Sequence, residues 1–109
     1  MSVLPKVGID LVYLPRIAAV YARFGQRFLD RVFTATEQAY CLQSIPHRLA
    51  RLGGRWAAKE AVVKALGTGW QGYGYTEIEI VASPQGSPQV HLIGDWSLSI
   101  SHDGDYAIA

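Results

Sequence analysis

Cysteine is almost missing from this sequence, because Cys41 is the only one among 109 residues. A single cysteine excludes an intrachain disulfide and a multi-cysteine metal site. Its place between Tyr40 and Leu42 favours a buried structural thiol over a nucleophile. No apolar run comes near the roughly 18 residues that a membrane-spanning helix needs, and the N-terminus lacks the basic, apolar, small-residue order of a signal peptide. We therefore expect a protein that stays in the cytoplasm.

Metal-binding and nucleotide-binding motifs are also missing. The histidines, His47, His91 and His102, show no metal-ligand spacing, which argues against a zinc site. No Walker-type pattern of glycine followed by lysine occurs. The Gly67-Thr68-Gly69 segment has backbone donors that suit a phosphate, but such glycines more often only end a helix.

Lysine and arginine are absent from residues 70–109. All ten lie in residues 1–69 with only four acidic residues, so that part carries a charge of +6, whereas the five acidic residues of the remainder give −5. Such an asymmetry indicates an anionic partner for the first part: a phosphate-bearing ligand, a nucleic acid or an acidic protein. It would also let the basic part of one subunit face the acidic part of another.

The length predicts a single domain over residues 1–109, because half of the residues are apolar and the chain is too short for two cores. Pro15 suits the first turn of a helix, and Thr34 with Glu37 matches a capping box. The expected helices cover residues 15–24, 34–43 and 48–66, the last being loosened near Gly53 and Gly54. The expected strands cover residues 3–10, 77–81, 89–93, 96–101 and 106–109. Helices followed by mostly antiparallel strands predict an α+β fold with the helices packed on the sheet.

The most informative segment is the charged end of the last expected helix, residues 55–69. Gly67 fits its C-terminal cap, and Glu60 and Lys64 share one face because they are four residues apart. An ordinary solvent-facing Glu–Lys pair explains this spacing as well as a functional site does. Asp10 lies at an expected strand-to-helix junction, where it either joins Glu60 in holding a hard cation such as Mg²⁺ or caps the next helix.

Basic side chains in and near this helix suit a polyphosphate, because phosphoryl transfer asks a protein mainly to position the reactants and to neutralise charge. The candidates are Arg48, Arg55, Lys59 and Lys64. Solvated surface charge is the competing explanation. His102 follows a strand that points toward the core, so it is either a structural histidine or a ligand contact.

Five short segments occur in an order that carries a resemblance. They are Gly8–Asp10, Phe33–Thr34, Trp56–Lys64, Gly67–Gly69 and Ser99–His102. The sequence resembles the phosphopantetheinyl transferase superfamily, whose signature pairs Gly-x-Asp with a downstream Trp/Phe-x-x-Lys-Glu-x-x-x-Lys segment. Within it, the sequence is most similar to the small subgroup, the holo-acyl-carrier-protein synthases. The resemblance covers nearly the whole chain and implies the 4′-phosphopantetheinyl transferase fold.

The resemblance implies transfer of the 4′-phosphopantetheine arm of coenzyme A to a serine of an apo acyl carrier protein, with release of adenosine 3′,5′-bisphosphate. Asp10 and Glu60 would hold Mg²⁺ against the pyrophosphate, and Glu60, directly or through a water, would help to remove the serine proton. Lys64 would neutralise charge on the phosphate, with Lys59 and Arg55 assisting. The further residues implied to border coenzyme A are Arg48, Gly67, Thr68 and His102.

The resemblance also implies a homotrimer with active sites between subunits. An acidic carrier protein would then dock on a basic surface, which we define as Arg16, Arg23, Arg27 and Arg31. The alternative for these arginines is a simple solvated helix face.

A function of a different class is an anion-binding or nucleic-acid-binding module. In that interpretation, the Arg16 to Arg31 surface with Phe24, Phe28 and Phe33 would grip single-stranded nucleic acid by phosphate contacts and stacking. Two observations argue against it. The spacing of Phe24 and Phe28 fits a core better than a stacking platform, and the acidic second half of the chain would repel a wrapped strand.

Overall fold

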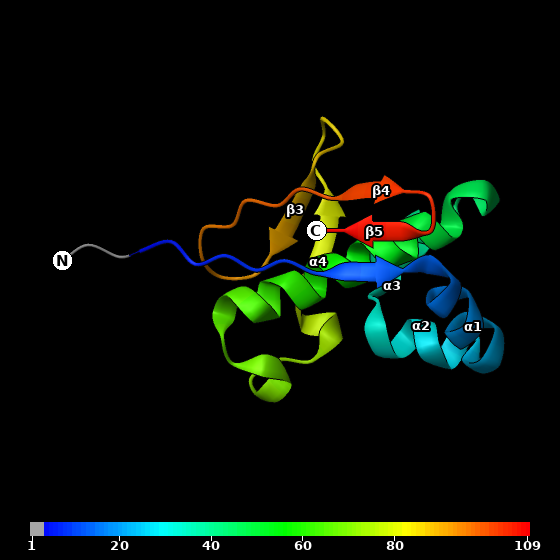
Figure 1. The fold of residues 1–109 in the computed structure, drawn as a ribbon, viewed down its shortest axis with the longest axis horizontal. Coiled ribbons are helices and arrows are strands. Elements are labelled where there is room, and N and C mark those ends of the chain that lie inside the picture. The colour runs from blue at the N-terminus through cyan, green and yellow to red at the C-terminus, as the bar shows by residue number, and fades with distance from the viewer. Residues whose placement is uncertain (1–3) are drawn as a thin grey trace.

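The computed structural model describes residues 4–109, which contain four α-helices and five short strands (Figure 1). The helices are α1 (Leu14–Phe24), α2 (Gln26–Val32), α3 (Ala35–Leu42) and α4 (Arg48–Leu66). The strands are β1 (Leu11–Tyr13), β2 (Glu79–Ala82), β3 (Pro88–His91), β4 (Ser101–Asp103) and β5 (Tyr106–Ile108). Short 3₁₀ turns lie at Ile45–His47, Gly69–Gln71 and Tyr75–Glu77. The expected α+β fold is therefore confirmed.

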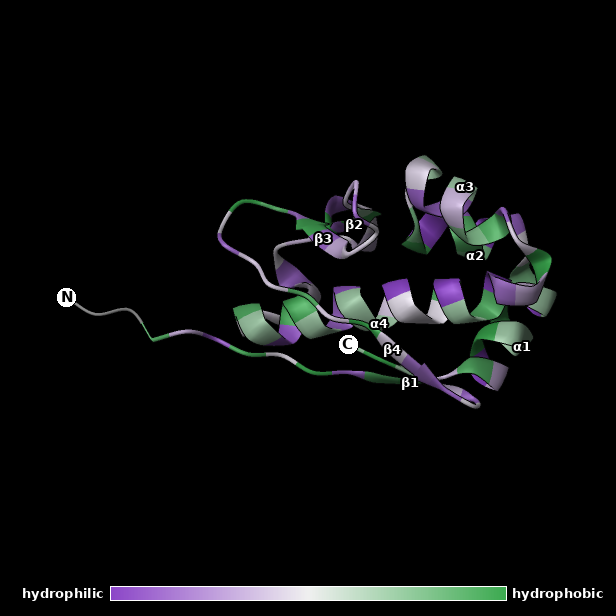
Figure 2. Cartoon of the chain, turned by 90° about the horizontal axis from the view of Figure 1, so that it is seen from above, coloured by the Kyte–Doolittle hydropathy of each residue, from purple (hydrophilic) through white to green (hydrophobic). Residues whose placement is uncertain are grey.

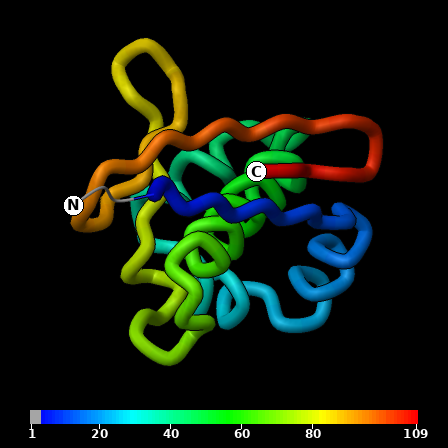
Figure 3. Tube along the Cα trace, turned by 60° about the vertical axis from the view of Figure 1, so that its left-hand side comes forward, coloured from blue at the N-terminus to red at the C-terminus, as the bar shows by residue number. Residues whose placement is uncertain are grey.

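Helix α4 runs through the middle of the molecule (Figure 2). On one side lies an antiparallel sheet in the order β1-β5-β4, with Leu11 opposite Ile108 and His102 opposite Ala107. On the other side lie α2, α3 and the antiparallel pair β2–β3. Figure 3 shows that β1 and β5, from the two ends of the chain, run side by side across α4. The helix can therefore present side chains to both layers.

Glycines let the first segment and α1 approach α4 closely. A Cβ atom at Gly8 would overlap the carbonyl oxygen of Ala61, and one at Gly53 would overlap the Leu14 side chain. A Cβ atom at Gly54 would lie only 2.9 Å from His102 Nε2. The expected loosening of the helix at Gly53 and Gly54 is therefore wrong. Because these glycines provide room for neighbouring elements, α4 continues through them as one helix.

The core has two parts, and helix α4 contributes residues to both. One lies among the first three helices and includes Phe28, Leu29, Phe33 and Cys41. The other lies against β2 and is built from Ala58, Val62, Val63, Ile78 and Ile80. The prediction of a buried structural thiol is confirmed, because Cys41 has no exposed surface and burial raises its pKa to about 12.

The capping box at the start of α3 is confirmed. The Thr34 backbone N–H donates to Glu37 Oε1 at 2.8 Å, and the Glu37 N–H donates to Thr34 Oγ1 at 3.2 Å. The left-handed cap at Gly67, with φ of 76°, is confirmed as well and ends α4 after Leu66. A side-chain cap thus sets the start of α3, and a left-handed glycine sets the end of α4.

Several element boundaries differ from those predicted. Within the expected strand 3–10, Val3 lies outside the described residues, and residues 4–10 form no strand, although Asp10 exchanges backbone hydrogen bonds with Ala109. Only Ser101 of the expected strand 96–101 belongs to a strand. Helix α2 was not predicted. Strand assignment depends on a neighbouring strand, which a period-two pattern alone does not supply.

Candidate functional site

Asp10 and Lys64 meet where the segment before β1 crosses the last turns of α4. Lys64 Nζ donates to Asp10 Oδ1 and to the Ile9 carbonyl oxygen, both at 3.0 Å. The Lys64 side chain is 56% exposed and the Asp10 side chain 17%. An ammonium has three donors, so one Lys64 N–H has no partner among residues 4–109. The helix-cap interpretation of Asp10 is wrong, because Tyr13 is the N-cap of α1.

Glu60 does not pair with Lys64 in the part of the chain that the structure describes. Three aromatic side chains bind its carboxylate instead. Tyr75 Oη donates to Glu60 Oε1 at 2.8 Å, Trp56 Nε1 to the same oxygen at 3.2 Å, and Trp70 Nε1 to Oε2 at 3.3 Å. Burial raises the pKa of Tyr75 to about 12, and the hydrogen bond to Glu60 acts in the same direction. The phenol therefore keeps its proton at neutral pH and serves as a donor.

A pocket with a volume of about 200 Å³ brings the two expected metal ligands together. It is lined by Asp10, Leu11, Val12, Tyr13, Arg16, Ile17, Trp56 and Glu60. Asp10 arrives from the segment before β1, Arg16 from α1, and Glu60 from α4. The pocket therefore joins two carboxylates to the first arginine of the basic surface.

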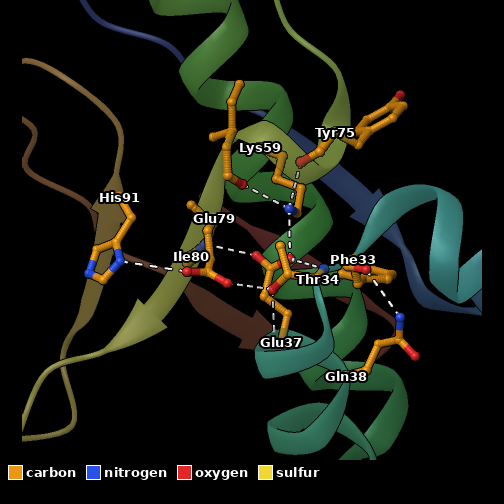
Figure 4. Close-up of polar contacts among 10 residues, drawn as sticks. Phe33, Thr34, Glu37, Gln38, Lys59, Tyr75, Glu79, Ile80 and His91 are labelled. Atoms are coloured by element: carbon orange, nitrogen blue, oxygen red, sulfur yellow. Dashed lines mark hydrogen bonds and ion pairs between the residues drawn. The ribbon is translucent and has the colours of Figure 1, made fainter.

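Lys59 is buried in a polar cluster with Glu37 and the segment after α4 (Figure 4). Its Nζ lies 2.8 Å from Glu37 Oε1, and it donates to the carbonyl oxygens of Tyr75 and Ile78, each at 2.8 Å. Neither charged side chain has exposed surface. Burial lowers the pKa of Lys59, and Glu37 opposes that shift.

The burial of Lys59 argues against its expected role in assisting at the phosphate, which stays a prediction. Successive residues on a helix point about 100° apart, since a turn holds 3.6 residues. With Glu60 turned toward the pocket, Lys59 is turned into the protein. Its three donors are all occupied by protein oxygens, so none remains for a ligand.

The arginines of α4 contact the protein itself. Arg55 is 7% exposed, and its Cζ lies 3.9 Å from the centre of the Tyr40 ring. Arg48 Nη2 donates to the Leu42 carbonyl oxygen at 3.1 Å. Neither arginine is among the residues that line the pocket of Asp10 and Glu60. Their contribution to coenzyme A binding stays a prediction.

The remaining expected nucleotide contacts lie at two other places. His102 Nε2 lies 2.8 Å from the Ala50 carbonyl oxygen, which gives the ring a structural contact with α4. Gly67 and Thr68 are exposed just past the end of α4, where Thr68 Oγ1 donates to the Gly69 carbonyl oxygen at 3.1 Å. Their ligand-binding roles also stay predictions.

The basic surface is exposed along α1 and α2, whereas the aromatic platform of the nucleic-acid interpretation is not. Phe28 is 6% exposed and Phe33 1%, so neither can stack on a base. Phe24, expected in the core, is 43% exposed at the last residue of α1, and Arg23 Cζ lies 5.0 Å from its ring centre. The nucleic-acid interpretation thus lacks its stacking surface.

The fold and the ordered motifs agree with comparisons to known proteins. A sequence model of the 4′-phosphopantetheinyl transferase superfamily matches residues 6–109. The chain belongs to this superfamily. A holo-[acyl-carrier-protein] synthase from Gloeobacter violaceus is 52% identical over 97% of this chain and 89% of its own. The resemblance inferred from the sequence is therefore confirmed.

Solved structures of superfamily members have the same fold. A holo-[acyl-carrier-protein] synthase from Neisseria meningitidis aligns with a TM-score of 0.88 and 31% identity over 97% of this chain and 94% of its own. The enzyme of Helicobacter pylori, solved in complex with coenzyme A, aligns with a TM-score of 0.84 and 32% identity over 94% of both chains. Among residues 4–109, no helix has the length and apolar character to span a membrane.

Sequence reasoning missed Trp70 and Tyr75, the two donors to Glu60 that come from the segment after α4. Their spacing from Glu60, ten and fifteen residues, matches no helical or strand period. The only signal was a concentration of aromatic residues after Gly69. Such a concentration is more often a core feature than a polar contact.

Proposed function

We propose that this protein transfers the 4′-phosphopantetheine arm of coenzyme A to a serine of an apo acyl carrier protein. The observation that carries this proposal is the convergence of three charged side chains. Asp10 pairs with Lys64 across 54 residues of sequence and lines the same pocket as Glu60. The relatives named as holo-[acyl-carrier-protein] synthases, one of them solved with coenzyme A, support the same reaction.

The reaction needs a base, a neutralising cation and correct placement of two substrates. The serine oxygen forms a bond to the phosphorus that bears the pantetheine arm, and the bond from that phosphorus to the bridging oxygen breaks. Adenosine 3′,5′-bisphosphate leaves, and Glu60, directly or through a water, removes the serine proton. Lys64, whose half-exposed side chain keeps one N–H without a partner among residues 4–109, neutralises charge on the phosphate.

The donor set of the pocket fits Mg²⁺. This ion is usually bound by one or two carboxylates together with waters and phosphate oxygens. Asp10 and Glu60 both line the pocket, and residues 4–109 contain no larger group of His, Cys, Asp and Glu arranged for a metal. These two carboxylates would hold the ion. When bound, Mg²⁺ would neutralise charge on the pyrophosphate and help to orient it.

The basic surface suits the acidic carrier protein. Arg16 lines the pocket, and Arg23, Arg27 and Arg31 continue the positive charge along exposed positions of α1 and α2. A carrier that docks along these arginines would bring its serine toward Glu60. Charges at the edge of an interface mainly raise the association rate. Replacing Arg23 and Arg27 should therefore lower the affinity for the carrier more than it lowers kcat.

Exposed apolar side chains support assembly into a homotrimer with active sites between subunits. Leu4 is 81% exposed, Val7 88%, Ile9 63% and Leu11 60%, and these residues form one continuous segment leading into β1. Contiguous apolar surface of this kind marks a protein contact. Because Asp10 lies in the same segment, a neighbour covering it would lie beside the pocket. Sedimentation equilibrium would give the mass of a trimer, and a monomer at all concentrations would refute this assembly.

A mass measurement tests the activity. The protein is incubated with an apo carrier protein, coenzyme A and MgCl₂, and the carrier should gain the mass of the phosphopantetheine arm. Asp10→Ala and Glu60→Gln should slow the gain by about 10²- to 10⁴-fold, to a residual rate that long incubations still measure. A wild-type protein that modifies none of several apo carriers would exclude the proposed function, and unchanged turnover in either variant would exclude the assigned roles.

A further inference from the structure

Both oxygens of the Glu60 carboxylate are held by aromatic donors. The hydrogen bond from Tyr75 Oη to Oε1, at 2.8 Å, is shorter than those from Trp56 at 3.2 Å and Trp70 at 3.3 Å. Trp70 and Tyr75 belong to the segment after α4, and their ring centroids lie 4.0 Å apart. The Trp56 ring meets Tyr75 edge-on, with centroids 6.2 Å apart. The three rings pack against one another while they bind one carboxylate.

We propose that Tyr75 is a positioning residue for Glu60, whose hydroxyl fixes the carboxylate toward the pocket that Glu60 shares with Asp10. The inference rests on the proposed function, in which Glu60 removes the serine proton, directly or through a water. An ionised carboxylate has about four lone-pair sites. Three of them are taken by the ring donors, so about one remains for a partner in the pocket.

The Tyr75 hydroxyl is placed by contacts other than its bond to Glu60. The backbone carbonyl oxygen of Tyr75 accepts from Lys59 Nζ at 2.8 Å, and Lys59 is fixed in turn by Glu37 at 2.8 Å. Lys59 also binds the Ile78 carbonyl oxygen, which anchors the chain just after Tyr75 (Figure 4). Lys59 and Glu60, which are neighbours on α4, therefore bind Tyr75 at its backbone carbonyl oxygen and at its hydroxyl. A donor held in this way orients its acceptor without reorganising during the reaction.

Tyr75→Phe removes the hydroxyl and keeps the ring contacts and the bond from Lys59 to the backbone. A hydrogen bond to a charged group is stronger than one between neutral groups. Because this bond holds the carboxylate in place for the chemical step, we expect kcat to fall about tenfold or more without it. The KM for coenzyme A should change less than about threefold, because a purely positional effect acts on the chemical step. Tyr73→Phe is the matched control, since Tyr73 packs against the core beside β2, and its kcat should stay within about twofold of wild type.

A double-mutant comparison separates positioning from a general structural effect. If the hydroxyl acts through Glu60, Tyr75→Phe should cause no further loss when added to Glu60→Gln. An equal loss in both backgrounds would overturn the proposal. So would a Tyr75→Phe enzyme within about twofold of wild-type kcat.

Indole N–H resonances give a test that does not depend on turnover. The chain has three tryptophans, of which Trp56 and Trp70 donate to Glu60 while Trp96 donates to the Ile93 carbonyl oxygen. In ¹H–¹⁵N spectra of the protein without metal or coenzyme A, Tyr75→Phe should shift the first two indole signals and leave that of Trp96 in place. Unshifted Trp56 and Trp70 signals would overturn the proposal. If the wild-type protein modified no carrier, the proposed function would fail, whereas the spectra would still report whether Tyr75 holds Glu60.

Discussion

Replacing Lys59 by methionine removes one charge from an ion pair in which neither side chain has exposed surface. The variant leaves the Glu37 carboxylate buried and takes the donor away from the carbonyl oxygens of Tyr75 and Ile78. Breaking one side of a buried ion pair destabilises a protein by about 3–5 kcal/mol. For a chain of this size that is a large part of the total free energy of unfolding. We therefore expect Lys59→Met to unfold at a much lower urea concentration than wild type.

Glu37→Gln added to Lys59→Met removes the uncompensated charge, while the amide oxygen remains able to accept from the Ile80 N–H, which donates to Glu37 at 2.7 Å in the wild type. The double variant should therefore be more stable than Lys59→Met alone, by about 1–3 kcal/mol. Urea unfolding with equal m-values would give the difference.

Lys6→Met is the control for the loss of a lysine, because Lys6 is exposed and surface substitutions usually change stability by less than about 0.5 kcal/mol. If Glu37→Gln destabilised Lys59→Met as much as it destabilises the wild type, the two charges would not be coupled. The argument from burial would then be refuted.

Three further predictions concern other parts of the molecule. Gly54→Ala would place a Cβ atom 2.9 Å from His102 Nε2 and should lower stability by about 1–3 kcal/mol in thermal unfolding, whereas Gly72→Ala, with open space around it, should be nearly neutral. Lys64→Ala should lower the carrier modification rate about 100-fold with an unchanged unfolding midpoint, because its side chain is 56% exposed; a rate near wild type would contradict its assigned role. Cys41 should react with a disulfide reagent at about pH 8 only when the protein unfolds. The pKa of Cys41 is about 12 in the folded protein against 9.0 ordinarily, so between these two pH values the folded state binds more protons than the unfolded state. The free energy of unfolding should therefore fall as the pH rises from 9.0 to about 12, and urea unfolding at several pH values would measure the fall.

Much of the fold follows from local sequence chemistry. Thr34 and Glu37 cap α3 by bonds within four residues, and Gly67 ends α4 by adopting a positive φ. These interactions need no distant partner, so a sequence pattern can predict them. Helix α2 lacked such a signal: its N-cap, Gly25, supplies no side-chain bond, and its seven residues are held by packing of Phe28, Leu29 and Val32.

The sequence was less reliable for individual side chains of α4. Glu60 and Lys64 lie four residues apart and could have formed an ordinary surface pair, but Lys64 binds Asp10 and Glu60 binds three rings. Lys59 was expected beside a phosphate and is instead the buried partner of Glu37. Helical spacing fixes the relative directions of side chains, whereas burial decides which direction faces solvent.

By itself, the sequence determined the α+β class, the superfamily and the charged groups available for chemistry. Only the tertiary structure decided which of those groups share a pocket and which lie in the core. The reason is physical: capping and helical periodicity act over a few residues, whereas the contact of Asp10 with Lys64 and that of Glu60 with Tyr75 depend on how elements from the two ends of the chain pack on α4. The close approach at Gly8, where a side chain would overlap Ala61, brings Asp10 to that helix.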